Sequence, residues 1–123
     1  MKLEPNMYVR LNCNYELGIG KIIREIDEDN FIKAKFKDYF ECSVPMYMIS
    51  KASHNIIDLI EVGDYVNGSK VIKIENVENY PDLSNVKIEK SDFRYGVYET
   101  VFENEIKSIV TKEQMEQIAY KVG

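Results

Sequence analysis

The sequence predicts a mainly β protein: two small SH3-like barrel modules packed together, with one short helix near the C-terminus. Nine tyrosines stand among 123 residues beside many isoleucines and valines, whereas alanine is scarce, and this bias favours strands. Asn67-Gly68 separates two runs rich in β-branched residues, which indicates a two-residue hairpin turn. A looser form of the same pattern, at residues 4–9 and 18–23, opens the chain. We therefore expect a similar module in each half.

The length suits one domain or two very small ones. We place the first SH3-like module at residues 1–54 and the second, which carries the helix, at residues 55–123. One compact domain overall is the alternative to this division.

The first half of the chain predicts four strands, at residues 7–11, 18–26, 31–37 and 40–44. The third has the clearest period of two, with Ile32, Ala34 and Phe36 on one face, as expected of a half-buried strand. Its other face is a stripe of lysines: Lys33, Lys35 and Lys37. Pro45 ends the fourth strand or pushes it to an edge.

The second half begins with an apolar run, residues 56–60, that we interpret as a strand linking the modules. Residues 46–53 before it have no decisive period and fit one irregular helical turn, and residues 75–84 read as a loop. Further strands are predicted at residues 65–66, 71–74, 86–89, 95–102 and 106–110. Thr111 and Gln114 fit a capping box, which predicts a short helix at residues 112–119 and then a last strand at residues 120–122.

The charge balance and the cysteine content set limits on function and location. The net charge is −5, and the acidic excess lies in residues 55–123, with thirteen acidic and eight basic side chains. Proteins that coat duplex DNA are usually basic, so this balance argues against general nucleic-acid binding. The sequence has no apolar run of membrane-spanning length and no signal-peptide pattern at its start. Together with two cysteines that make no disulfide framework, this predicts a cytoplasmic protein.

The residues that most often carry catalysis form no recognisable constellation. His54 is the only histidine, and nothing pairs it with a nucleophile. The spacing of Cys13, Cys42 and His54 is not that of a zinc site, and buried thiols acting as small apolar side chains are the ordinary interpretation. Phosphate-binding glycine loops are also missing from the sequence. We therefore expect no enzyme activity, no cofactor and no metal.

The lysine stripe is the one candidate binding face, with Lys21 and Arg24 expected on the neighbouring strand. SH3-like barrels bind nucleic acid or peptides through such surfaces when aromatic side chains lie beside the charges. Three tyrosines are candidates for this role: Tyr8, Tyr15 and Tyr39. The alternative is a solvated sheet face whose lysines discourage edge-to-edge pairing.

Several stretches occur together and in order: Val9-Arg10, residues 18–22, residues 55–68, residues 106–114 (Ile-Lys-Ser-Ile-Val-Thr-Lys-Glu-Gln) and Tyr120-Lys121-Val122. With them the chain resembles a group of small uncharacterised proteins of phages and prophages in clostridia and related Gram-positive bacteria. The resemblance spans both ends and the centre, and it leaves out residues 75–94. It implies an accessory protein encoded by a phage and present inside the host cell. The resemblance does not imply any catalytic residues in this chain.

The leading hypothesis is a non-enzymatic interaction module that binds a host or phage protein, since tyrosine is common at protein interfaces. The alternative is a nucleic-acid-binding accessory factor that uses the Lys33/Lys35/Lys37 face. An enzyme would need a deep pocket with perturbed carboxylates. We expect a protein partner and no membrane association, and the sequence does not indicate an oligomeric state.

Overall fold

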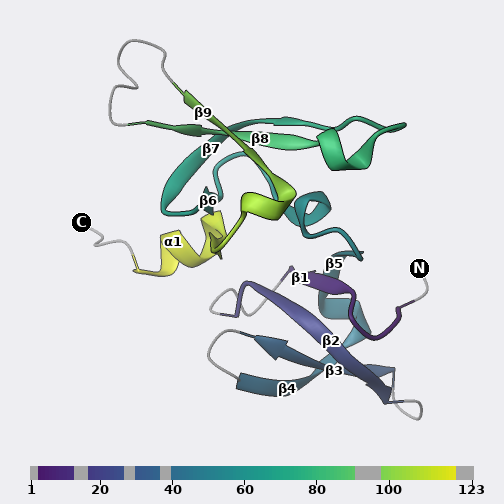
Figure 1. Ribbon diagram of the computed structural model, residues 1–123. Coiled ribbons are helices and arrows are strands. Elements are labelled where there is room, and N and C mark those ends of the chain that lie inside the picture. Colours follow the sequence, from purple (N-terminus) through teal and green to yellow (C-terminus); the bar gives the residue numbers. More distant parts are fainter. Residues whose placement is uncertain (1–2, 13–16, 27–29, 37–39, 91–97, 119–123) are drawn as a thin grey trace. The chain divides into compact units, whose positions relative to one another are not determined.

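The computed structural model describes residues 3–12, 17–26, 30–36, 40–90 and 98–118. Within these residues the chain forms ten strands in two five-stranded antiparallel sheets, several short 3₁₀ turns and one short α-helix (Figure 1). The prediction of a mainly β protein with one short C-terminal helix is therefore confirmed.

The first sheet contains β1 (Tyr8–Leu11), β2 (Ile19–Ile26), β3 (Phe31–Phe36), β4 (Phe40–Pro45) and β5 (Ile49–Ser53). Its strand order is β4-β3-β2-β1-β5. A 3₁₀ turn at Met46–Met48 leads out of β4, and β5 then returns to pair with β1. Pro45 ends a strand at the edge of the sheet, where a missing backbone donor costs little.

One face of the first sheet is a hydrophobic core, and β3 shows why. Its residues alternate between half-buried and buried side chains, because the apolar residues recur every second position and a strand sends them to one side. Ile32 and Ala34 are fully buried there. The other buried members of the core come from the end of β3, from β1, β2 and β4, and from the N-terminal segment: Leu3, Met7, Val9, Leu11, Ile22, Phe36 and Val44.

The second sheet contains β6 (Tyr65–Val66), β7 (Ser69–Glu75), β8 (Asn85–Glu89), β9 (Tyr98–Phe102) and β10 (Ile109–Val110). Its strand order is β10-β6-β7-β8-β9. A 3₁₀ turn at Pro81–Leu83 precedes β8, and another at Glu103–Glu105 follows β9. Both sheets thus have the same connectivity: four strands in sequence, a 3₁₀ turn, and a fifth strand that pairs with the first. This repeat agrees with the two similar modules that the sequence predicts.

The Asn67-Gly68 turn between β6 and β7 has the geometry that the dipeptide predicts. Both residues have positive φ, 51° and 85°, as a type I′ turn requires. The Asn67 side chain also forms hydrogen bonds outside the turn. Its Oδ1 accepts from the backbone amides of Lys107 and Ser108 at 2.8 and 3.2 Å. Its Nδ2 donates to the Glu105 carbonyl at 3.0 Å. The turn therefore also holds the segment that leads into β10.

Three predictions of local structure need correction. The apolar run that we interpreted as a linking strand is a 3₁₀ turn, Ile56–Leu59, in which Ser53 Oγ donates to Asp58 Oδ2 at 2.6 Å. The irregular helical turn expected within residues 46–53 is present as the 3₁₀ turn Met46–Met48, but the rest of this segment forms β5, which the sequence did not predict. The strand predicted at residues 106–110 is only β10, two residues long. Short apolar runs fit a strand or a helical turn equally well, so local hydrogen bonds decide between them.

Helix α1 (Lys112–Ile118) begins directly after Thr111, as predicted. The chain divides by its contacts into two compact units, one of Met1–Leu59 with Glu113–Gly123 and the other of Ile60–Lys112. All but the first residue of the helix thus belongs with the first sheet. The division into modules at residues 1–54 and 55–123, with one compact domain as the alternative, stays a prediction.

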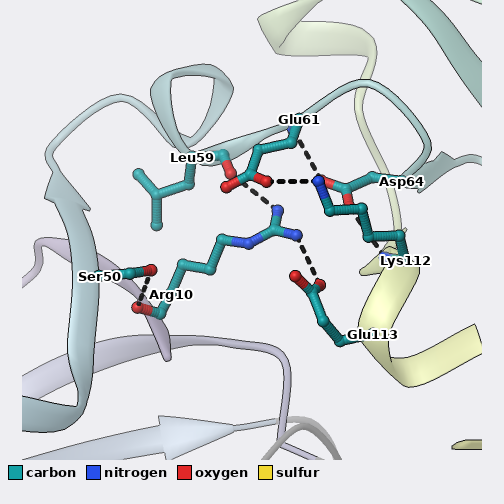
Figure 2. Close-up of polar contacts among 7 residues, drawn as sticks. All are labelled: Arg10, Ser50, Leu59, Glu61, Asp64, Lys112 and Glu113. Carbon is teal, nitrogen blue, oxygen red and sulfur yellow. Dashed lines mark hydrogen bonds and ion pairs between the residues drawn. The ribbon is translucent and has the colours of Figure 1, made fainter. Parts of the chain in front are cut away.

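A buried arginine holds distant segments of the first unit together (Figure 2). Arg10 on β1 is 2% exposed, and its Nη1 donates to the Leu59 carbonyl at 3.0 Å. Its Nη2 forms an ion pair with Glu113 Oε2 at 2.8 Å, while its own carbonyl accepts from Ser50 Oγ at 3.1 Å. Leu59 and Glu113 are the residues at which the chain leaves and re-enters this unit. Arg10 therefore bonds both to the residue at which the chain leaves this unit and to the residue at which the chain returns to it.

A buried aspartate has the corresponding position in the second unit (Figure 2). Asp64 is fully buried, and its two carboxylate oxygens accept from the backbone amides of Glu61 at 2.7 Å and Lys112 at 2.9 Å. The side chains of Lys112 and Glu61 also form an ion pair at 2.8 Å. Asp64 thus joins the first and last segments of this unit and provides an acceptor for the first amide of α1.

Candidate interaction face

The outer side of the first sheet brings together basic side chains from β2 and β3. Lys21 lies opposite Lys35, and Arg24 lies opposite Lys33. Residues directly opposite each other in an antiparallel ladder point to the same side of the sheet. We call these four residues, Lys21, Arg24, Lys33 and Lys35, the basic face. Lys21 and Arg24 thus lie beside the lysines of β3, as the sequence predicts. That this group of side chains binds a partner is proposed below.

A β-bulge makes this grouping possible. In a regular strand, residues three apart point to opposite sides, so Lys21 on the outer side would leave Arg24 on the core side. The register of β2 against β3 shifts between Ile22 and Arg24, and this shift brings Arg24 opposite Lys33. Ile22 stays in the core at 1% exposed, and Ile23, the extra residue, is 39% exposed. The bulge therefore places one exposed apolar side chain in the strand segment that carries the basic face.

The basic face has one acidic neighbour on β4. Glu41 lies opposite Lys35, and its carboxylate forms an ion pair with Lys33 at 3.7 Å. Both members of this pair are substantially solvent-exposed, so it contributes little stability. Among the residues that the structure describes, these four basic side chains and one acidic side chain leave a positive excess on this side of the sheet. The two like-charged pairs across β2 and β3 also repel each other, which costs free energy in the folded protein.

Tyr8 on β1 extends the same row of residues. It lies opposite Lys21, whose Nζ is 5.5 Å from the centre of the Tyr8 ring, within the range of a cation–π interaction. The row across the sheet is thus Tyr8, Lys21, Lys35 and Glu41. Three other residues predicted for this face, Lys37, Tyr15 and Tyr39, lie outside the described residues.

The other residues singled out in the sequence have ordinary structural surroundings. His54 Nε2 lies 2.8 Å from Glu4 Oε2, and both side chains are about half exposed. Cys42 lies opposite Ala34 and packs against the hydrophobic core, and burial raises the pKa of its thiol. Cys13 lies outside the described residues. Among the residues that are described, no group of three or more histidine, cysteine, aspartate or glutamate side chains is arranged to hold a metal ion.

Sequence reasoning missed two features of this face, the bulge and the contribution of Glu41. Neither has a local signal, because a bulge is set by how two strands pair and Glu41 joins the face only through its register with β3. It also missed the buried role of Arg10, since Val9-Arg10-Leu11 reads as ordinary strand alternation.

The comparisons with known proteins add no assignment. No protein-family model matches the chain, and no curated protein is a significant match to it. The part of the chain that the structure describes contains no helix with the length and hydrophobicity needed to cross a membrane.

Proposed function

We propose that this protein is a phage- or prophage-encoded accessory protein that acts as a non-enzymatic interaction module. Its basic face binds an acidic segment of a host or phage protein. The observation that carries the proposal is the pairing of Lys21 with Lys35 and of Arg24 with Lys33 on one side of the first sheet.

The electrostatics of the pairs support a bound anion. Like charges directly opposite each other destabilise a sheet, and here two such pairs are neighbours. An anionic partner neutralises the facing positive charges and so removes their repulsion. The relief of this repulsion makes the free energy of binding more favourable. The same positive field also speeds the encounter with an acidic surface.

The dimensions of the face favour a protein segment in extended conformation. Lys33 and Lys35 are two positions apart on one strand, a separation of roughly 7 Å. Acidic side chains at every second position of a partner strand have the same spacing. The strands β2 and β3 are about 4.8 Å apart, so each partner carboxylate can lie between two basic groups. The exposed Ile23 adds an apolar contact of the kind found in protein interfaces.

A nucleic-acid partner is the second candidate, and Tyr8 is the observation that favours it. An aromatic ring beside a row of basic groups is the combination on which single-stranded nucleic acids bind, with bases stacked on the ring and phosphates on the cations. The net charge of −5 opposes this candidate, because the long-range field of the protein repels a polyanion.

Fluorescence anisotropy with two probes tests the proposal. One probe is a labelled peptide that alternates glutamate and threonine, and the other is a labelled oligothymidine. We expect saturable binding of the peptide that weakens as salt rises, with weaker binding of the oligonucleotide. Tighter binding of the oligonucleotide, with the steep salt dependence of phosphate contacts, would reverse the order of the two candidates.

The variant Lys21→Glu/Lys35→Glu should lose peptide binding. Lys70→Glu/Lys107→Glu is the matched control, because it changes the net charge by the same amount at two exposed lysines of the second unit. Equal loss of binding in both variants would show that only total charge matters, and the basic face would then have no specific role. Affinity purification with the wild-type protein and the first variant, from phage-infected host cells, identifies the partner that depends on this face.

A further inference from the structure

The second unit contains a cavity with no role in the function proposed above. Its volume is about 630 Å³, and its described walls come from the 3₁₀ turn before β8, the last residue of β9 and the 3₁₀ turn after β9: Asp82, Leu83, Phe102, Glu103, Asn104 and Glu105. This volume lies in the range of cavities that bind small ligands or single side chains.

The chemistry of the walls is strongly one-sided. Asp82, Glu103 and Glu105 supply three carboxylates, and the described lining includes no lysine, arginine or histidine. Leu83 and Phe102 supply apolar surface, and Leu83 is 50% exposed although it is apolar. Acidic and apolar walls together match a group that has a positive end and an apolar stem.

One residue next to these walls, although not part of them, has a buried polar atom without a partner among the described residues. Asn85 on β8 lies opposite Phe102 and is 5% exposed, and its Nδ2 donates to the carbonyl of Leu83 at 3.1 Å. Its Oδ1 has no hydrogen-bond partner among the described residues. A buried acceptor without a donor costs free energy.

We propose that this cavity binds the side chain of an arginine presented by a partner protein. The aliphatic stem packs between Leu83 and Phe102, and the guanidinium meets the carboxylates of Asp82 and Glu103. Arginine suits the site better than lysine because its planar fork of donors can bond two carboxylates at once. This site lies in the second unit and does not depend on the basic face.

A metal ion is a poorer match for the same carboxylates. Calcium and magnesium need several oxygen ligands around one point, and the described residues contain no such group of acidic side chains. An organic cation, whose charge is spread over several atoms, does not require the carboxylates to converge on a single point.

The test is an NMR titration of ¹⁵N-labelled full-length protein with a capped peptide that has a single arginine between glycine and serine residues. We expect saturable shifts in the backbone amides of residues 82–85 and 102–105. The same peptide with citrulline, which is close in shape and uncharged, should bind at least tenfold more weakly. Equal binding of both peptides, or the absence of saturable shifts at these amides, would overturn the proposal. Tighter binding of spermidine than of the arginine peptide would also overturn it, by identifying a free polyamine as the ligand.

A matched pair of variants separates the site from general electrostatics. Asp82→Asn/Glu103→Gln removes two cavity carboxylates, and we expect it to abolish the titration shifts. Glu78→Gln/Glu99→Gln removes the same number of charges from exposed positions outside the lining and should bind like the wild type. The spectra of the free variants show directly whether each is folded. Equal loss of binding in the two variants would reject the cavity as the site.

Discussion

Arg10 Nη2 lies 2.8 Å from Glu113 Oε2, although the two residues are 103 positions apart in the sequence. Arg10 is buried and Glu113 is about a quarter exposed. Loss of the carboxylate would leave a buried guanidinium with part of its charge unpaired, which is far costlier than loss of a surface ion pair. The pair therefore joins the start of α1 firmly to β1.

We predict that Glu113→Ala lowers the free energy of unfolding by about 2–3 kcal/mol. Arg10→Met keeps the stem of the side chain and removes its charge. The double variant Arg10→Met/Glu113→Ala should then lose less stability than the sum of the two single variants, because the second change no longer breaks an ion pair. Urea unfolding of all four proteins measures this coupling. Losses that add to within about 0.5 kcal/mol would show that the pair contributes nothing.

This ion pair marks the limit of what the sequence could predict. Period-two alternation and a turn dipeptide are local signals, so they located β3 and the Asn67-Gly68 hairpin correctly. Arg10 has no such signal, because its role depends on the return of the chain to β1 after the whole second unit. The charged residues Asp64 and Glu113 were likewise invisible as partners, since their contacts depend on how distant segments meet.

The candidate face was predictable to a similar degree. Alternation alone requires Lys33 and Lys35 to point outward once Ile32 and Ala34 point into the core. The position of Arg24 on the same side required the bulge after Ile22, which depends on the pairing of two strands. The cavity beside β9 could not be predicted, because the loop from residue 75 onward has no periodic pattern and its walls come from segments about twenty residues apart.

Gly68→Ala should destabilise the protein by about 1 kcal/mol. The cost comes from the backbone alone, since φ is +85° and nothing lies within 4 Å of an added Cβ. Asn67→Gly keeps the turn conformation and removes the hydrogen bonds to residues 105–108, so we expect it to be at least as costly. Denaturant midpoints test both variants. A Gly68→Ala protein as stable as the wild type would contradict the positive-φ turn.

Asp64→Ala should be among the most damaging single changes in the second unit, with a loss of about 2–4 kcal/mol. It removes the acceptor of two backbone amides, those of Glu61 and Lys112, in a fully buried place. Thr111→Ala, directly before the helix, should cost only about 1 kcal/mol through loss of a cap. Thermal unfolding measures the two losses side by side. A smaller loss for Asp64→Ala than for Thr111→Ala would show that Asp64 does not hold the two segments together.

Cys42 gives a prediction for pH dependence. Burial raises the pKa of its thiol above the ordinary value, so less thiolate is present in the folded protein than in the unfolded chain at mildly alkaline pH. The resulting stabilisation is fully present below the unfolded-state pKa and is lost as the pH rises through the higher folded-state pKa. In a Cys13→Ser background, alkylation by iodoacetamide at pH 8 should be slower in native protein than in urea. Equal rates would mean that the thiol is not shielded.

The variant Arg24→Glu distinguishes the effect of the basic face on stability from its effect on peptide binding. Arg24 is exposed and lies opposite Lys33, so charge reversal turns a repulsive cross-strand pair into an attractive one. We expect the free energy of unfolding to rise by about 0.2–1 kcal/mol. Binding of the acidic peptide should weaken at the same time, because one of the four basic groups then repels it. Lys70→Glu, an exposed substitution on β7 with the same change in net charge, should leave peptide binding close to that of the wild type. Urea unfolding and anisotropy on the same preparations give both quantities. If the variant gains stability and still binds the peptide with wild-type affinity, this side of the sheet is an ordinary solvated surface and not a binding face.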